Sequence, residues 1–278
     1  MSQNNKFVEL MKLFRLWNGL IATLGLLLGA AVATGLGNLA DWINELILGA
    51  VVVLLFVGAG NSLNDYFDVE TDKIAHPNRP LPKGTLSRRV ALYSSAAMFA
   101  GCIILGIFIN LISLSIVILA IIAMIAYELK MKSLGFAGNI VIALLVAALF
   151  EFSGSVVGMP EMTLVLATLS GLATLGREIV KDIEDIEGDL TRSTLPKKIG
   201  ARKAGYVAII PTLFAVGLSP IPFLQNQLTL FYLIVVAVAD ALFIYGAIIQ
   251  LKSPNRGQKI YKVAMIVALI AFAVGVRT

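Results

Sequence analysis

The sequence predicts an all-α, polytopic membrane protein: a bundle of nine transmembrane helices with a cytoplasmic cap of two Asp-rich loops. Two observations support this fold class. Hydrophobic residues make up 58% of the 278 residues and charged residues only 14%, which leaves too few polar side chains to cover a soluble domain. Long apolar runs also recur, and about 17–25 helical residues are enough to cross roughly 30 Å of hydrocarbon.

Nine apolar runs are expected to cross the membrane as helices, because they are too long and too uniformly apolar for barrel strands. They cover residues 17–37, 43–63, 90–110, 112–126, 136–157, 162–176, 204–224, 228–250 and 261–276. No small-residue cleavage site accompanies the first run, so we expect a retained helix rather than a signal peptide. Cys102, the only cysteine, lies inside the third run; it excludes an intramolecular disulfide and is expected to be core.

Lys and Arg fall on one side of these predicted spans. Of the 22 Lys and Arg residues, all but Arg277 lie at the N-terminus or in connections that reach the same face as the N-terminus. The positive-inside rule makes that face cytoplasmic, so we expect a multi-pass cell-membrane protein whose N-terminus is in the cytoplasm. Topology and attraction to anionic membrane lipids account for the net charge of +5, which therefore does not indicate a nucleic-acid partner.

Two acidic stripes occur where the second and sixth runs reach the cytoplasmic face. At 100° per residue, the first occupies about 100° of a helix that extends the second run, and the second occupies about 60°. The first contains Asn61, Asn64, Asp65, Asp68 and Asp72, and the second contains Glu178, Asp182, Asp185 and Asp189. Each stripe alone also fits a solvated helix end, but two matching stripes favour a shared function.

Carboxylates that repel one another are the natural ligands of a divalent cation. Mg²⁺ prefers oxygen ligands and is commonly held by one or two carboxylates together with substrate phosphates. We therefore predict a Mg²⁺ and diphosphate site at the cytoplasmic side. The predicted metal ligands are Asn64, Asp65, Asp68, Asp72, Asp182, Asp185 and Asp189.

The two stripes also indicate an internal repeat. Asp65, Asp68 and Asp72 have the same spacing as the three aspartates that begin at Asp182, 117 residues later, and Leu-Pro-Lys follows each stripe. Four predicted spans separate the stripes, which returns both to the same face. We expect one domain, residues 1–278, with halves of roughly 1–133 and 134–278.

Other polar residues are placed near the same cap. Tyr127 and Lys130 close the fourth run, with Lys132 just after them, and each could equally be an interfacial anchor. Arg79 lies in a proline-rich loop that could cover the site, whereas the adjacent His76 is interpreted as a plain loop residue.

Two further observations concern the spans themselves. Arg15 and Asn18 enter the first run from the cytoplasm and could line the same cavity. Glu151 and Asp240 lie inside predicted spans, where an acidic residue is by default a functional candidate. Neither is at the level of the stripes, so buried pairing or a shifted helix register is the favoured interpretation of both.

Taken together, these motifs resemble the UbiA superfamily of intramembrane prenyltransferases over nearly the whole chain. The motifs are Asn64-x-x-x-Asp68-x-x-x-Asp72, Tyr127-x-x-Lys130 and Asp185-x-x-x-Asp189. The resemblance implies transfer of an isoprenyl group from its diphosphate to an acceptor, with Mg²⁺ held by the two acidic motifs. Where NRPNRP would be expected the chain has HPNRP, so no role is implied for His76.

Within the superfamily, NDYFDVETDKI and REIVKDIEDIEGD are most similar to archaeal ether-lipid enzymes. The similarity implies transfer of a geranylgeranyl group from geranylgeranyl diphosphate to the hydroxyl of geranylgeranylglyceryl phosphate. The implied catalytic residues are Asp68, Asp72, Asp185, Asp189 and Lys130. Diphosphate binding is expected from Asn64, Arg79, Tyr127, Lys130, Lys132 and Asp182, and cavity lining from Arg15 and Asn18.

The expected partners are a prenyl diphosphate, a lipid-like acceptor and membrane lipids, with no nucleic acid and no obligate protein partner. Superfamily members that prenylate aromatic acceptors share the metal motifs, so an aromatic acceptor stays an alternative. A transporter is the main alternative outside enzymes, although coupling carboxylates usually lie near mid-membrane. A CDP-alcohol phosphotransferase is a further alternative, but its single contiguous Asp motif is absent from the sequence.

Overall fold

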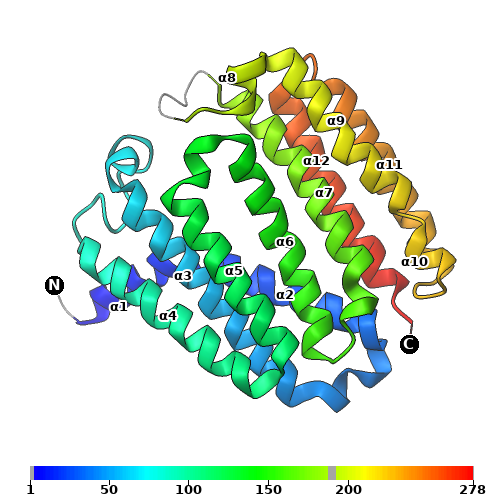
Figure 1. Ribbon diagram of the computed structural model, residues 1–278, viewed down its shortest axis with the longest axis horizontal. Helices are drawn as coiled ribbons and strands as arrows, with labels where there is room; N and C mark the ends of the chain where they lie inside the picture. Colours follow the sequence, from blue (N-terminus) through cyan, green and yellow to red (C-terminus); the bar gives the residue numbers. More distant parts are fainter. Residues whose placement is uncertain (1–2, 187–191, 278) are drawn as a thin grey trace.

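The computed structural model describes residues 3–186 and 192–277, and every regular element in those ranges is helical (Figure 1). The long helices are α2 (Leu16–Thr34), α3 (Ile43–Ala75), α4 (Arg88–Ile109), α5 (Leu111–Leu129), α6 (Phe136–Val156), α7 (Pro160–Glu184), α9 (Ala201–Leu218), α11 (Leu230–Ile249) and α12 (Pro254–Gly275). The short elements are α1 (Gln3–Phe14), η1 (Leu36–Trp42), η2 (Met131–Leu134), α8 (Leu195–Ile199) and α10 (Ile221–Leu224).

Nine helical segments in the described part of the chain are long and apolar enough to cross a membrane, which confirms the predicted all-α membrane fold. The helices at the two shortest internal runs are longer than the sequence indicated. The span predicted at 112–126 is α5, Leu111–Leu129, and the span predicted at 162–176 is α7, Pro160–Glu184. Hydropathy identifies only the part of a helix that is apolar enough to lie in the hydrocarbon core. The helix itself continues for as long as its backbone hydrogen bonds are made.

Neighbouring spans pack side by side along the chain. Helix α3 packs against α2 and α4, α7 packs against α6 and α9, and α11 packs against α12. Helix α2 also contacts α6 and α7, which joins α2, α3 and α4 to the later spans (Figure 1). The order α2–α5 followed by α6, α7, α9 and α11 is compatible with two halves of four spans plus a ninth, so the internal repeat stays a prediction.

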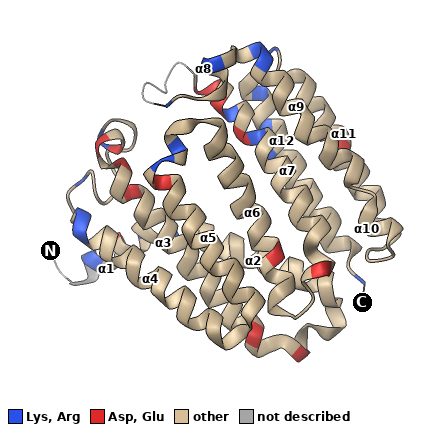
Figure 2. Ribbon diagram, viewed as in Figure 1, with Lys and Arg blue, Asp and Glu red and all other residues tan. Residues whose placement is uncertain are grey.

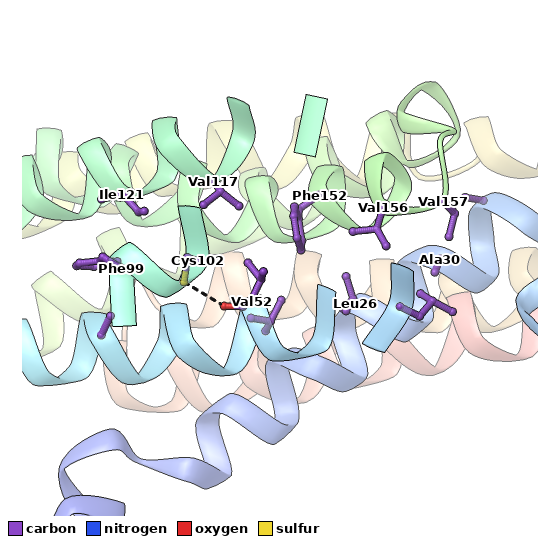
Figure 3. Close-up of a cluster of buried hydrophobic side chains, with 14 of the residues drawn as sticks. Leu26, Ala30, Val52, Phe99, Cys102, Val117, Ile121, Phe152, Val156 and Val157 are labelled. Carbon is purple, nitrogen blue, oxygen red and sulfur yellow. Dashed lines mark hydrogen bonds between the residues drawn. The ribbon is translucent and has the colours of Figure 1, made fainter. Parts of the chain in front are cut away.

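Small residues allow the central helices to approach closely, as is common where lipid supplies no hydrophobic driving force between helices. A side chain at Gly29 on α2 would collide with Ser153 on α6. Cys102 is fully buried in the cluster between α2, α3 and α4, and its thiol donates to the carbonyl of Val52 at 3.5 Å (Figure 3). The cysteine is thus a core residue, as the sequence indicated.

Helix α1 precedes the first span and was not marked by hydropathy. It ends at Phe14, and Arg15, whose φ of 50° is in the left-handed region, separates it from α2. Its buried Leu13 packs with Leu81 and Leu86 of the connection between α3 and α4. Polar residues interrupt the apolar ones along α1, so the helix contains no long apolar run for hydropathy to mark.

Charges are distributed unevenly over the bundle (Figure 2). Lys and Arg gather at the end that carries α1 and α8, and at the opposite end they are seen beside the C-terminus. The C-terminal ends of α3, α5 and α7 therefore meet in a basic environment.

A substitution at Glu9 tests how α1 is attached to the connection between α3 and α4. The Glu9 carboxylate accepts hydrogen bonds from Lys12 at 2.7 Å and from the Thr85 hydroxyl at 2.8 Å, and these bonds lower the Glu9 pKa from its ordinary 4.5. A lowered carboxyl pKa stabilises the fold above the ordinary pKa, and the effect is lost as the pH falls through the lowered one. Glu9→Gln should lower Tm in detergent by about 2–4 °C at neutral pH, and the difference should narrow in acid. A difference that grows in acid would contradict this.

Candidate active site

A polar cavity of about 340 Å³ lies between the ends of α3, α5 and α7, with η2 and the start of α6 completing its wall. Its lining includes Asn64, Asp68, Asp72, His76, Arg79, Tyr127, Lys132, Asn139, Glu178, Lys181, Asp182 and Arg192. Members of both predicted stripes therefore face one cavity: Asn64, Asp68 and Asp72 from α3, and Glu178 and Asp182 from α7. Basic side chains alternate with the acids around it.

Arg79 covers the α3 side of the cavity. Its Nη1 lies 2.8 and 2.7 Å from the two carboxylate oxygens of Asp72 and 3.7 Å from Asp65. Asp65 is buried and does not line the cavity; it accepts from Arg15 at 2.5 Å, and Arg15 also donates to Asn61 at 2.9 Å. Asp65, predicted as a metal ligand, thus contacts two arginines, and Arg15 lines neither this cavity nor the apolar one described below.

The fourth span contributes Tyr127 and the turn after it contributes Lys132, whereas Lys130 is exposed and is not part of the lining. Helix α5 ends at Leu129, Lys130 caps it, and the tighter 3₁₀ turn of η2 carries Lys132. The Lys132 ammonium lies 2.5 Å from Asp68 and 3.3 Å from Glu128. The change of helix type therefore turns Lys132, rather than Lys130, into the site.

On the α7 side, the Asn139 amide donates to the buried Asp182 at 2.8 Å. Glu178 pairs with Arg177 and lies 4.0 Å from Lys181. Asp185 follows the end of α7, is exposed, and is absent from the cavity lining. The predicted continuous helical face through Asp185 therefore stops one residue short, and Asp189 lies outside the described residues.

Gly135 brings the two halves of the cap together. Its φ is +63°, and an added Cβ would collide with the backbone of Ser193 and Thr194. The backbone N–H of Ser193 donates to the carbonyl of Ser133 in η2 at 3.1 Å. Glycine therefore permits Ser193 and Thr194 to pack directly on η2, which brings the lining residues Arg192 and Thr194 to the same wall as Lys132.

A second, apolar cavity of about 630 Å³ lies deeper in the bundle, between α2, α6, α7, α11 and α12. Its lining includes Asn18, Ile21, Gly25, Leu28, Phe150, Leu166, Leu169, Ala173, Phe243 and Phe272. Along α7 the apolar lining ends at Ala173 and the polar lining begins at Glu178, a separation of roughly 7–8 Å on a helix. Both cavities are therefore lined by α7, although at 100° per residue the two sets of lining residues lie on faces of that helix roughly 120° apart.

The two acidic residues within spans differ in their surroundings. Asp240 lines the apolar cavity and accepts from the Ser219 hydroxyl at 2.6 Å, which is the paired arrangement that was favoured. One carboxylate oxygen of Glu151 is buried and has no hydrogen-bond partner among the described residues.

Oxygen donors around the polar cavity fit a hard divalent cation. Asn64, Asp68, Asp72 and Asp182 all present amide or carboxylate oxygens to it. No three acidic, His or Cys side chains in the described ranges converge as a ready-made metal site. The set therefore suits an ion that takes one or two protein ligands and completes its shell with substrate phosphates.

The lining residues that were not predicted from the sequence include Asn139, Lys181, Arg192 and Thr194, and also His76, which had been interpreted as a plain loop residue. Glu128, just behind the lining, was also missed. Lys181 and Glu128 stand within the quoted motifs and could have been found there, but Asn139 stands apart in the sequence at the start of α6 and meets Asp182 only in the folded bundle.

Comparisons with known proteins agree with this geometry. The model of the UbiA prenyltransferase family matches residues 16–272. The chain belongs to the UbiA prenyltransferase family. A UbiA member from Methanosphaera stadtmanae, digeranylgeranylglyceryl phosphate synthase, is 36% identical over 98% of this chain and 99% of its own length. The enzyme of the same name from Methanosarcina mazei is 39% identical over 96% of this chain and 97% of its own length.

Solved UbiA structures share the fold. A structure concerned with digeranylgeranylglyceryl phosphate synthase in membranes superposes with a TM-score of 0.89 at 33% identity, covering 98% of this chain and 99% of that one. A UbiA homologue from Archaeoglobus fulgidus bound to GPP and Mg²⁺ has a TM-score of 0.63 at 15% identity, covering 96% of this chain and 99% of that one. This UbiA family member is thus a multi-pass membrane protein of a prenyltransferase family.

Gly135→Ala tests the contact between the two halves of the cap. The substitution adds left-handed strain of about 1–2 kcal/mol and forces Ser193 and Thr194 away from η2, so prenyl-transfer activity should fall steeply. Gly84→Ala is a matched control, because its φ is +75° yet a Cβ there meets open space. Equal losses in the two variants, measured by turnover and Tm, would show that only backbone strain matters.

Proposed function

We propose that this UbiA family member transfers a geranylgeranyl group from geranylgeranyl diphosphate to the hydroxyl of geranylgeranylglyceryl phosphate in archaeal ether-lipid synthesis. The observation that carries the proposal is the pairing of two cavities along α7, one polar with acids and cations, the other apolar. Relatives named digeranylgeranylglyceryl phosphate synthase over nearly the full length support this choice of acceptor.

The polar cavity is proposed to hold the diphosphate. Arg79, Lys132, Lys181 and Arg192 supply cationic groups to its wall, and Asn64, Asp68, Asp72 and Asp182 are the proposed Mg²⁺ ligands. Bound Mg²⁺ supplies neutralisation of the charge that develops on the departing diphosphate. Asp65 and Arg15 support the site indirectly: Asp65 lies close to the Arg79 guanidinium while Arg15 neutralises Asp65.

In the proposed reaction the bond between C1 of the prenyl chain and the diphosphate oxygen breaks, and the electron pair leaves with the diphosphate. The acceptor hydroxyl oxygen forms the new bond to C1. Its proton passes to an acceptor oxygen, either of a cavity carboxylate or of the departing diphosphate. Preorganised cations stabilise the leaving group without rearrangement at the moment of reaction, which is the main contribution we assign to Lys132 and Arg79.

The apolar cavity is proposed to take a prenyl chain. Its volume of about 630 Å³ lies within the range of sites for small molecules. On α6, Asn139 lines the polar cavity and Val146 and Phe150 line the apolar one, all within about 40° at 100° per residue, so a chain attached to a diphosphate would run along that face of α6. An apolar lining also keeps water away from a reactive allylic carbon.

The active site is proposed to face the cytoplasm. The ends of α3, α5 and α7 that line the polar cavity belong to the end of the bundle where Lys and Arg gather (Figure 2), and the positive-inside rule supports a cytoplasmic location for that end. Carboxylates at one rim of the bundle, rather than at mid-membrane, favour an enzyme over a transporter.

The direct test is an assay of purified protein with geranylgeranyl diphosphate and Mg²⁺. Offered geranylgeranylglyceryl phosphate, the protein should form the digeranylgeranyl ether and release diphosphate, and removal of divalent metal by EDTA should abolish both. Excess Mg²⁺ should restore them. Consumption of an aromatic acceptor in place of the glyceryl phosphate would overturn the proposed acceptor, and flux across liposomes without diphosphate release would favour a transporter.

A pair of lysine variants tests the placement of the diphosphate site. Lys132→Gln should lower kcat by about 10²–10³-fold, because a preorganised cation is lost from the cavity wall. Lys130→Gln should cost far less, because Lys130 is exposed outside the lining. The two substitutions remove the same charge two residues apart, so the reverse order of losses, measured by steady-state kinetics, would refute this placement.

A further inference from the structure

Glu128 is a buried carboxylate directly behind the polar cavity. Its side chain is fully shielded from solvent and it does not line the cavity. Each of its oxygens contacts a residue that does: Oε1 accepts from the Asn64 amide at 2.9 Å, and Oε2 lies 3.3 Å from the Lys132 ammonium. Glu128 thus connects a proposed metal ligand on α3 with a proposed phosphate-binding cation on η2.

The hydrogen bond to Asn64 fixes which end of the amide faces the cavity. Asn64 donates through Nδ2 toward Glu128, so its Oδ1 is the amide atom left for the cavity side. Only the carbonyl oxygen of an amide is a suitable ligand for a hard cation. A carboxylate at position 128 accepts but cannot donate, so it selects this orientation.

Lys132 lies between two carboxylates of different kinds. Asp68 lines the cavity, with a side chain 26% exposed, whereas the Glu128 side chain is 0% exposed. A divalent cation bound by Asp68 would repel the ammonium now 2.5 Å from that carboxylate. Because Glu128 is already within reach, Lys132 can give up Asp68 and still keep a partner.

We propose that Glu128 is a positioning residue with two tasks. It turns the Asn64 carbonyl toward the cavity. It is also the alternative ion-pair partner of the Lys132 ammonium when Asp68 binds a divalent cation. The inference rests on the proposed metal-dependent function and goes beyond it, since Glu128 contacts neither substrate nor metal in this scheme.

A purely structural role for Glu128 predicts different behaviour. If Glu128 only joined α3 to α5 and η2, its loss would destabilise the bundle, and removing Lys132 as well would not repair metal binding. If Glu128 is instead the alternative ion-pair partner of Lys132, a neutral residue at position 128 leaves Lys132 with Asp68 as its only carboxylate partner in the described site. The ammonium then competes with the metal, and deleting it removes the competitor.

The experiment titrates detergent-purified protein with Mn²⁺ alone, followed by EPR, and needs no turnover. Glu128→Gln keeps an amide oxygen that can accept from Asn64 but offers no charge to Lys132, so Mn²⁺ affinity should fall about 10–100-fold. In Glu128→Gln combined with Lys132→Gln, affinity should return close to that of the unaltered protein. Glu128→Leu combined with Lys132→Gln should recover less, because the Asn64 amide also loses its acceptor.

Controls separate the possible failures. Glu70→Gln removes a glutamate that is 76% exposed and paired only with Lys73, so its Mn²⁺ affinity and Tm should be unchanged. Unchanged affinity in Glu128→Gln, or no recovery in the double variant, would overturn the role of Glu128 while leaving the proposed function intact. If the unaltered protein binds no Mn²⁺, both the inference and the proposed metal site fall.

Discussion

The site depends on how carboxylates of like charge are kept together at the mouth of the bundle. Asp72 is paired with Arg79, Asp68 with Lys132, and the buried Asp182 accepts from the neutral amide of Asn139. Buried charges that lack such partners would shift toward neutrality or push the helices apart. The donors for these three aspartates come from the connections after α3 and α5 and from the start of α6, whereas Glu178 pairs with Arg177 of α7 itself.

This requirement explains the construction of the cap. Arg79 reaches Asp72 from the connection after α3, and Lys132 reaches Asp68 only because α5 gives way to the 3₁₀ turn of η2. Gly135 then lets the backbone after α7 pack on that turn. The cap is thus held by pairing charges across elements, whereas the transmembrane part is held by apolar clusters and close helix contacts at small residues.

The length of apolar runs was sufficient to predict the spans, and helical periodicity was sufficient to place Asn64, Asp68 and Asp72 on one face of α3. Both are properties of a single regular helix. Periodicity failed where a helix ends or changes type, and where burial decides whether a side chain reaches the cavity. Asp65 lies at the edge of its stripe and turns toward Arg15, Lys130 falls where α5 ends, and Asp185 follows the last turn of α7. Partners such as Asn139 and Glu128 depend on contacts between helices that a single sequence does not encode as a pattern.

The separation of polar and apolar lining along α7 has a mechanistic consequence. Helix α7 presents Leu166, Leu169 and Ala173 to one cavity and Glu178, Lys181 and Asp182 to the other, so one rigid element sets both the depth of the tail and the position of the headgroup. In the proposed reaction the allylic bond breaks at the boundary between the two cavities, where cations can reach the diphosphate oxygens and the carbon lies beside apolar lining. A loop could not hold that boundary as well, because rotation of a helix moves all of its lining residues together. The reaction proposed for this protein therefore follows from the register of α7 relative to its neighbours as much as from the identity of its acidic residues.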